Sequence, residues 1–106
     1  MKNGMSVIRK IGKKSGIPRI WLEGEIPLKA GFLPGSKFEV KVYKKKIILV
    51  RKATGSRVVN KKKANGKFYP IVDIQLKAIK ETFPRAKAVK VVFKKGQITF
   101  SSAAGL

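Results

Sequence analysis

The chain has 106 residues, which is the size of one compact domain or of two very small ones. Lysine and arginine total 26 against 5 acidic residues, so the formal charge is +21, and a domain this basic repels itself and favours a polyanionic partner. Because the chain contains neither cysteine nor histidine, disulfides, thiolate nucleophiles, histidine bases and Cys/His metal sites are excluded.

The first half of the chain alternates apolar and polar residues in the pattern of short strands. A Lys- and Gly-rich arm precedes a predicted strand over Arg19–Leu22. A short helix is predicted over Gly24–Ala30, with Pro27 in its first turn. From Phe38 to Val50 the alternation predicts a hairpin with Lys44-Lys45-Lys46 as its turn.

The second half repeats this order at a constant offset of 51 residues. A strand is predicted over Pro70–Asp73, a helix over Ile74–Thr82, and a second hairpin from Val89 to Phe100 around Lys95-Gly96. Identical residues at this offset are Val7 and Val58, Lys10 and Lys61, Ile20 and Ile71, Phe32 and Phe83, Val40 and Val91, Lys44 and Lys95, and Ile47 and Ile98.

We therefore predict two pseudo-repeats, over about residues 5–52 and 56–103, joined by a flexible linker at about 52–56. About fifty residues rarely bury enough surface alone. With 43% hydrophobic residues, the chain can close one shared core by pairing strands from both repeats. We expect one pseudo-symmetric domain over residues 1–106, mostly β with short helices.

Several segments of the first half resemble the AbrB/SpoVT swapped-hairpin family, and its SymE-like branch most closely. They are Arg9-Lys10-Ile11-Gly12, Ile17-Pro18-Arg19-Ile20-Trp21-Leu22-Glu23-Gly24, Leu28-Lys29-Ala30-Gly31-Phe32-Leu33, Pro34-Gly35-Ser36-Lys37-Phe38-Glu39-Val40 and Ile47-Ile48-Leu49. The resemblance implies interleaved hairpins in a small barrel-like fold, usually as a homodimer, with DNA contacts from basic arms. This chain departs from it by carrying both units, as MraZ-like members do, and by having Phe83-Pro84-Arg85-Ala86 at the second turn.

Basic clusters are the candidate binding residues, because lysines on a glycine-bearing flexible arm can follow phosphates along a groove. By position, the resemblance implies nucleic-acid contacts in the first arm from Arg9, Lys10, Lys13, Lys14 and Arg19. The 51-residue offset places Lys61, Lys62, Lys63 and Lys67 in the equivalent region of the second arm, and Arg57 is a further candidate. Lys44, Lys45 and Lys46 are further candidates, although a charged hairpin tip is more often only a solvated turn. Since 21 of the basic residues are lysines, backbone contacts with weak sequence selectivity are favoured, and Arg9 and Arg19 are the candidates for groove contacts.

The aromatic and acidic residues have two interpretations each. Trp21, Phe68 and Tyr69 could stack on unpaired bases, but we favour a role in covering the small core. Glu23 and Glu25 are close together, but nothing completes a metal site around them, so we interpret them as surface or capping residues paired with lysines. We expect no catalytic residues, no metal and no cofactor.

The sequence thus predicts a non-enzymatic protein that binds nucleic acid, duplex DNA above all, in transcription regulation or nucleoid architecture. The alternatives are a SymE-like toxin of a toxin–antitoxin system and a basic protein that binds RNA or single strands. The longest strongly apolar run, Ile47–Val50, is too short to span a bilayer, and Met1–Gly16 lacks the apolar stretch of a secretory signal. We expect a cytoplasmic, nucleoid-associated protein with no membrane partner, either a monomeric pseudo-dimer or a homodimer.

Overall fold

The computed structural model describes residues 5–103 and is mostly β, as predicted. The ends of the predicted domain, residues 1–4 and 104–106, lie outside the described residues. The first half forms β1 (Met5–Lys10), β2 (Gly12–Lys14), β3 (Ile17–Glu23), α1 (Glu25–Lys29), β4 (Lys37–Val42) and β5 (Lys46–Arg51). The second half forms β6 (Arg57–Val58), β7 (Asn60–Ala64), β8 (Lys67–Gln75), α2 (Ala78–Thr82), β9 (Ala88–Lys94) and β10 (Gln97–Ser102).

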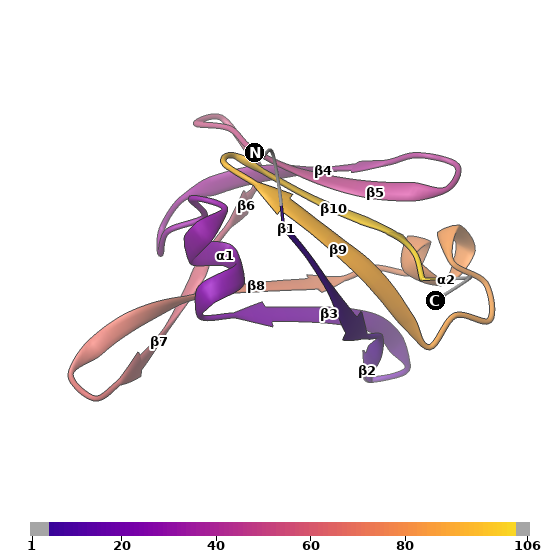
Figure 1. Ribbon diagram of the computed structural model, residues 1–106, viewed down its shortest axis with the longest axis horizontal. Coiled ribbons are helices and arrows are strands. Elements are labelled where there is room, and N and C mark those ends of the chain that lie inside the picture. The colour runs from indigo at the N-terminus through magenta and orange to yellow at the C-terminus, as the bar shows by residue number, and fades with distance from the viewer. Residues whose placement is uncertain (1–4, 104–106) are drawn as a thin grey trace.

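The strands of residues 5–103 form two antiparallel sheets, and each sheet contains strands from both halves (Figure 1). The larger sheet has the order β1-β9-β10-β5-β4-β6, so the first strand of each half borders the hairpin of the other half. The smaller sheet has the order β2-β3-β8-β7. Both sheets are open, so the strands do not close into the single barrel that the family resemblance implies.

The strand pairs at the centre of both sheets have the symmetry of the 51-residue repeat. Ile98 pairs with Leu49, and Ile47 pairs with Phe100, which is the same contact moved by 51 residues. The register of β3 on β8 is symmetric in the same way. The outer strands depart from this symmetry, because β6 pairs Val58 with Lys37 where the register of β1 on β9 would bring it to Val40.

One hydrophobic core cluster lies between the sheets and includes residues from both halves. Strand β3 contributes Ile20 and Leu22, and β8 contributes Val72 and Ile74, all buried and two residues apart as the pleat requires. From the larger sheet the buried residues are Phe38, Ile47, Leu49, Val89, Val91, Phe93, Ile98 and Phe100. The rings of Phe32 and Phe38 lie 5.6 Å apart between their centroids.

The first helix forms over Glu25–Lys29, close to the prediction, with Pro27 in its first turn. The second helix forms only over Ala78–Thr82, so the prediction that it begins at Ile74 was wrong. Ile74 pairs with Ile20 in the sheet and is fully buried. Burial between the sheets therefore outweighs the local helical pattern at this position.

The segment predicted to be a flexible linker is a fixed turn. The amide of Gly55 donates to the carbonyl of Lys52. The amide and hydroxyl of Ser56 both donate to Glu39 Oε1, at 2.7 and 2.8 Å. Gly55 also lies directly against the backbone of Phe38. The passage between the two halves is thus built into the larger sheet.

The turn that follows each helix needs a residue with positive φ. Gly31 and Gly35 supply it in the first half, with φ of 77° and 86°, and Arg85 supplies it in the second half, with φ of 65°, one position before the residue that the 51-residue offset aligns with Gly35. An L side chain is disfavoured in this region by roughly 1–2 kcal/mol. The second half therefore keeps the turn that its sequence does not indicate, at a cost in backbone strain.

Substitution of Gly55 by alanine tests the close approach of the linker to the sheet. A Cβ atom there would lie 2.5 Å from the carbonyl carbon of Phe38 and 2.6 Å from its amide nitrogen. We expect Gly55→Ala to lower the free energy of unfolding by about 1–3 kcal/mol, measured by urea denaturation. In the control Gly12→Ala, the new Cβ meets only the Arg19 carbonyl oxygen at 3.8 Å, and the change should stay below about 1 kcal/mol. Equal effects of the two substitutions would contradict the described packing.

Candidate nucleic-acid interface

Four of the predicted basic residues of the first half lie on two consecutive edge strands, one in each sheet. Arg9 and Lys10 end β1, the edge strand of the larger sheet, and Lys13 and Lys14 lie in β2, an edge strand of the smaller sheet. Between them the amide of Ile11 donates to the carbonyl of Lys87 at 2.8 Å, which fixes the crossing from one sheet to the other. All four basic side chains are exposed.

The predicted lysines of the second half lie at the opposite edge of the smaller sheet. Lys61, Lys62 and Lys63 are consecutive residues of β7, and Lys67 begins β8. All four are exposed. Because successive side chains of a strand point to opposite faces, Lys62 lies on one face of the β7–β8 hairpin while Lys61 and Lys63 lie on the other.

Both basic segments are strands of two-residue hairpins, so the prediction of flexible arms was wrong for them. Lys14 pairs with Ile17 around Ser15-Gly16, and Ala64 pairs with Lys67 around Asn65-Gly66. In both turns the two central residues have positive φ, as the tight turns that match strand twist require. The lysines are therefore held by backbone ladders and not by mobile chain. We call β2–β3 and β7–β8 the two basic hairpins.

The two basic hairpins lie at opposite ends of the smaller sheet (Figure 1). Arg19 pairs with Gln75 in the antiparallel β3–β8 ladder, so Ile17, which follows the first hairpin turn, lies level with position 77. The second hairpin turn ends at Lys67, which is ten positions from 77 along the same strand direction. At about 3.3 Å per residue, the two turns are roughly 30 Å apart along the strands. This separation is close to one turn of duplex DNA, about 34 Å.

Arg19 is held within the protein and does not present a free guanidinium. Its Nε donates to Asp73 Oδ1 at 2.8 Å and its Nη2 donates to Asp73 Oδ2 at 3.1 Å, while the guanidinium carbon lies 4.3 Å from the centroid of the Trp21 ring. The hydrogen bonds to Asp73 raise the pKa of Arg19 further above its ordinary value. The sequence interpretation of Arg19 as a groove contact does not fit this bidentate pair.

The remaining predicted contacts lie on the larger sheet. Arg57 is half-buried in the short strand β6, where it pairs with Phe38. Lys44, Lys45 and Lys46 are exposed at the tip of the β4–β5 hairpin, and Lys46 Nζ lies 5.6 Å from the Tyr43 ring centroid. The structure therefore groups Lys13, Lys14, Lys61, Lys62, Lys63 and Lys67 on the smaller sheet. The other candidates, Arg57, Lys44, Lys45 and Lys46, lie on the larger sheet or at the tip of its β4–β5 hairpin.

Of the three aromatic residues predicted to cover the core, Trp21 and Phe68 are exposed and Tyr69 is half-buried. Trp21 is 38% exposed and Phe68 is 55% exposed. Phe68 lies on the same face of its hairpin as Lys61 and Lys63, whose ammonium nitrogens are 4.7 and 6.0 Å from the ring centroid. This cluster was not predicted from the sequence, although the spacing of Lys61, Lys63 and Phe68 around an Asn-Gly turn indicates it.

Three ion pairs occur within residues 5–103, and two of them occupy the carboxylates considered for catalysis. Glu23 accepts from Trp21 Nε1 at 2.7 Å and from Lys62 Nζ at 3.1 Å, and Glu25 lies 3.7 Å from Lys29 Nζ. The surface interpretation of both residues is confirmed. Among the described residues, no three Asp or Glu side chains gather in a way that could hold a metal ion.

The hydrogen bonds to two of the carboxylates lower their pKa. For Glu23 the largest cause is the Trp21 indole, followed by Lys62, and for Glu39 it is the Ser56 amide, followed by the Ser56 hydroxyl. A carboxylate with a lowered pKa in the folded state stabilises the fold at neutral pH. The stabilisation that Glu39 gives to the turn between the halves is therefore lost at acid pH, when its carboxylate is protonated.

The pH dependence of folding tests this link. The contribution of Glu39 is fully present above the ordinary glutamate pKa of about 4.3 and is lost as the pH falls through the lowered pKa of the folded state. We expect Glu39→Gln to lose less stability than the wild type between pH 7 and pH 3, measured by urea unfolding at each pH. An identical loss in both proteins would show that the Ser56 contacts do not favour the ionised carboxylate.

No protein-family model, curated protein or solved structure matches this chain. Within residues 5–103, neither helix has the length and apolar character that crossing a membrane requires.

Proposed function

We propose that this protein binds duplex DNA by placing its two basic hairpins on the phosphates of successive helical turns, without catalysing a reaction. The observation that carries the proposal is the spacing of roughly 30 Å between the hairpin turns, which is close to one turn of the duplex. Lysines of both hairpins are exposed, and the net charge of +21 supplies the long-range attraction.

Low to moderate sequence selectivity follows from the residues involved. The hairpin candidates outside the Arg19–Asp73 pair are all lysines, which act on phosphates as point charges and lack the fork that reads guanine edges. Arg9 ends the strand that precedes the first basic hairpin, and its Nη1 donates to the carbonyl of Ile8. Such a protein suits nucleoid architecture or transcription regulation on preferred rather than strictly defined sites.

The exchange of strands between the halves supports the resemblance to the AbrB/SpoVT swapped-hairpin family. Each half lays its hairpin beside the first strand of the other half, and the hairpins meet through β5 and β10. In this proposal the two repeats form one pseudo-symmetric domain, a monomeric counterpart of a homodimer. A symmetric two-hairpin grip then requires only one chain.

A second candidate function is binding of RNA or single strands, as in a SymE-like toxin. The exposed ring of Phe68 beside Lys61 and the exposed indole of Trp21 favour it, because unpaired bases stack on aromatic rings flanked by cations. Competition of duplex DNA, single-stranded DNA and structured RNA for the protein separates the candidates. The duplex proposal expects the duplex to compete best at equal length.

The salt dependence of binding tests the phosphate grip. With roughly 6 to 10 phosphate contacts, the affinity for a 20-base-pair duplex should fall by about 10³ to 10⁵ between 50 and 200 mM salt. Fluorescence anisotropy of a labelled duplex measures this directly. A nearly flat response would contradict the proposal.

Charge-removing variants test which lysines make the contacts. We expect Lys13→Ala/Lys14→Ala and Lys61→Ala/Lys63→Ala each to weaken duplex binding and to reduce the slope of log affinity against log salt by about two. The control Lys94→Ala/Lys95→Ala removes the same charge from the exposed β9–β10 tip and should keep the slope. If all three double variants behave alike, binding reflects overall charge and not the two basic hairpins.

A further inference from the structure

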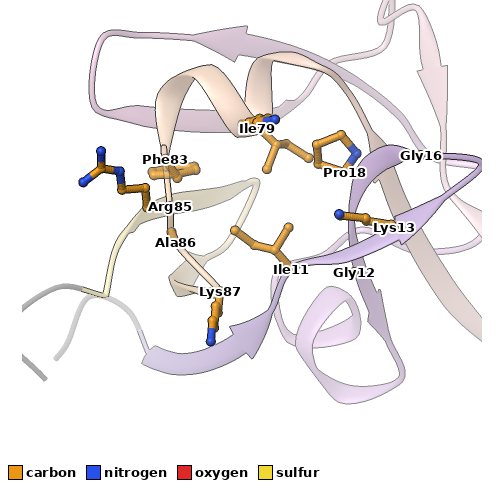
Figure 2. Close-up of a pocket in the computed structure, with 11 residues that line it drawn as sticks. Ile11, Gly12, Lys13, Gly16, Pro18, Ile79, Phe83, Arg85, Ala86 and Lys87 are labelled. Atoms are coloured by element: carbon orange, nitrogen blue, oxygen red, sulfur yellow. The ribbon is translucent and has the colours of Figure 1, made fainter.

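A pocket of about 360 Å³ opens between the first basic hairpin and α2. Ile11, Pro18, Ile79, Phe83 and Ala86 line it with apolar surface, and Figure 2 shows the side chains of Ile11, Pro18, Ile79 and Phe83 around one common space. Ile79 is fully buried and Phe83 is 4% exposed, so the floor of the pocket is part of the packed core. The pocket volume lies in the range of sites that hold a small organic group.

The mouth of this pocket is cationic on both sides. Lys13 comes from β2, while Lys80, Arg85 and Lys87 come from α2 and the segment that follows it, and the lining contains no carboxylate. Figure 2 shows the Lys13 ammonium directed toward the pocket and the side chains of Arg85 and Lys87 directed away from it into the surroundings. Lys13 can thus meet a negative group at the pocket itself, and Arg85 and Lys87 can meet one outside it, so a ligand with a flat ring and negative groups on its flanks matches this arrangement.

The second half does not repeat this lining. At the 51-residue offset, Lys62 stands in place of Ile11, and the exposed Leu28 stands in place of the buried Ile79. The apolar floor thus lies beside the first basic hairpin, and the second half has a lysine and an exposed leucine at the two compared positions. In the proposed duplex complex, the pocket is thus a distinct site beside the first of two otherwise similar basic hairpins.

We propose that the pocket receives one unpaired base of the bound nucleic acid, with the base on the apolar floor and its two flanking phosphates on the cationic mouth. The inference rests on the proposed function, because Lys13 belongs both to the pocket and to the first basic hairpin. An unpaired base has flat faces that stack on apolar surface, and the backbone places a phosphate on each side of its nucleotide, which is the pattern that the pocket offers. Bases that leave the stack lose little pairing energy when they are already unpaired.

The test compares three 20-base-pair duplexes: one perfectly paired, one with a single bulged adenosine, and one with a bulged abasic nucleotide at the same place. The abasic bulge keeps the phosphates and the flexibility but lacks the base. We expect the wild type to bind the adenosine bulge roughly fivefold or more tightly than the abasic bulge, the size of one base–aromatic contact. Equal affinities for the two bulges would overturn the inference.

Two pairs of variants locate the effect without changing charge. Ala86→Trp fills the pocket, and Ala53→Trp places the same side chain on the exposed turn between the halves. Ile11→Trp fills the pocket from the other side, and Ile8→Trp, at a 45% exposed position of β1, is its control. We expect the pocket variants to bring the adenosine and abasic bulges within twofold of each other and the controls to retain the preference. Retention in a folded pocket variant would overturn the inference.

The perfectly paired duplex separates the two proposals. If the wild type does not bind it, the proposed duplex-binding function fails. If the wild type binds it with the expected salt dependence but does not prefer the adenosine bulge, only the pocket inference fails. Thermal unfolding of each variant identifies those that fold, and the two pocket variants are independent, so one folded variant suffices for the comparison.

Discussion

The pairing of strands across the two halves is the constraint on which the rest of the structure depends. Strand β10 lies beside β5 and β8 lies beside β3, so the centre of both sheets is formed by contacts between the repeats. The core cluster is shared in the same way. A chain with a charge of +21 gains little stability from its surface, since like charges repel. Burial of apolar side chains between the sheets must therefore supply the free energy that offsets the repulsion between like charges.

Because buried apolar side chains stabilise the fold, the charged side chains lie at the surface. Among residues 5–103 no buried residue is polar or charged, and the basic side chains occupy edge strands, hairpin turns and exposed faces. Edge strands rich in lysine also discourage pairing with other chains. The same lysines on β2 and β7 therefore serve the fold as protected edges and serve the proposed function as phosphate contacts.

The sequence allowed prediction of the repeat, the two hairpins and the first helix, because each depends on local alternation or on a turn residue. It did not indicate that Ile74 continues a strand, since that depends on its pairing with Ile20 in the other half. Arg19 was a candidate for a DNA contact, together with Arg9, because an arginine fork suits base edges, whereas its partner Asp73 lies 54 residues away. The pocket, likewise, joins Ile11 to residues of α2 that no spacing connects. Contacts between distant segments cannot be predicted from the residue pattern of a single strand or helix.

The joining of both repeats in one polypeptide has a consequence for assembly. Because β5 pairs with β10 within one chain, the shared core contains strands from both repeats of a single polypeptide, and forming this arrangement requires no second copy. Two separate copies would dissociate on dilution and would remain identical at every position. The fused halves are free to diverge, as Ile11 and Lys62 have at the 51-residue offset, so that in the proposed duplex complex the first basic hairpin can acquire a neighbouring pocket while the second keeps only its lysines.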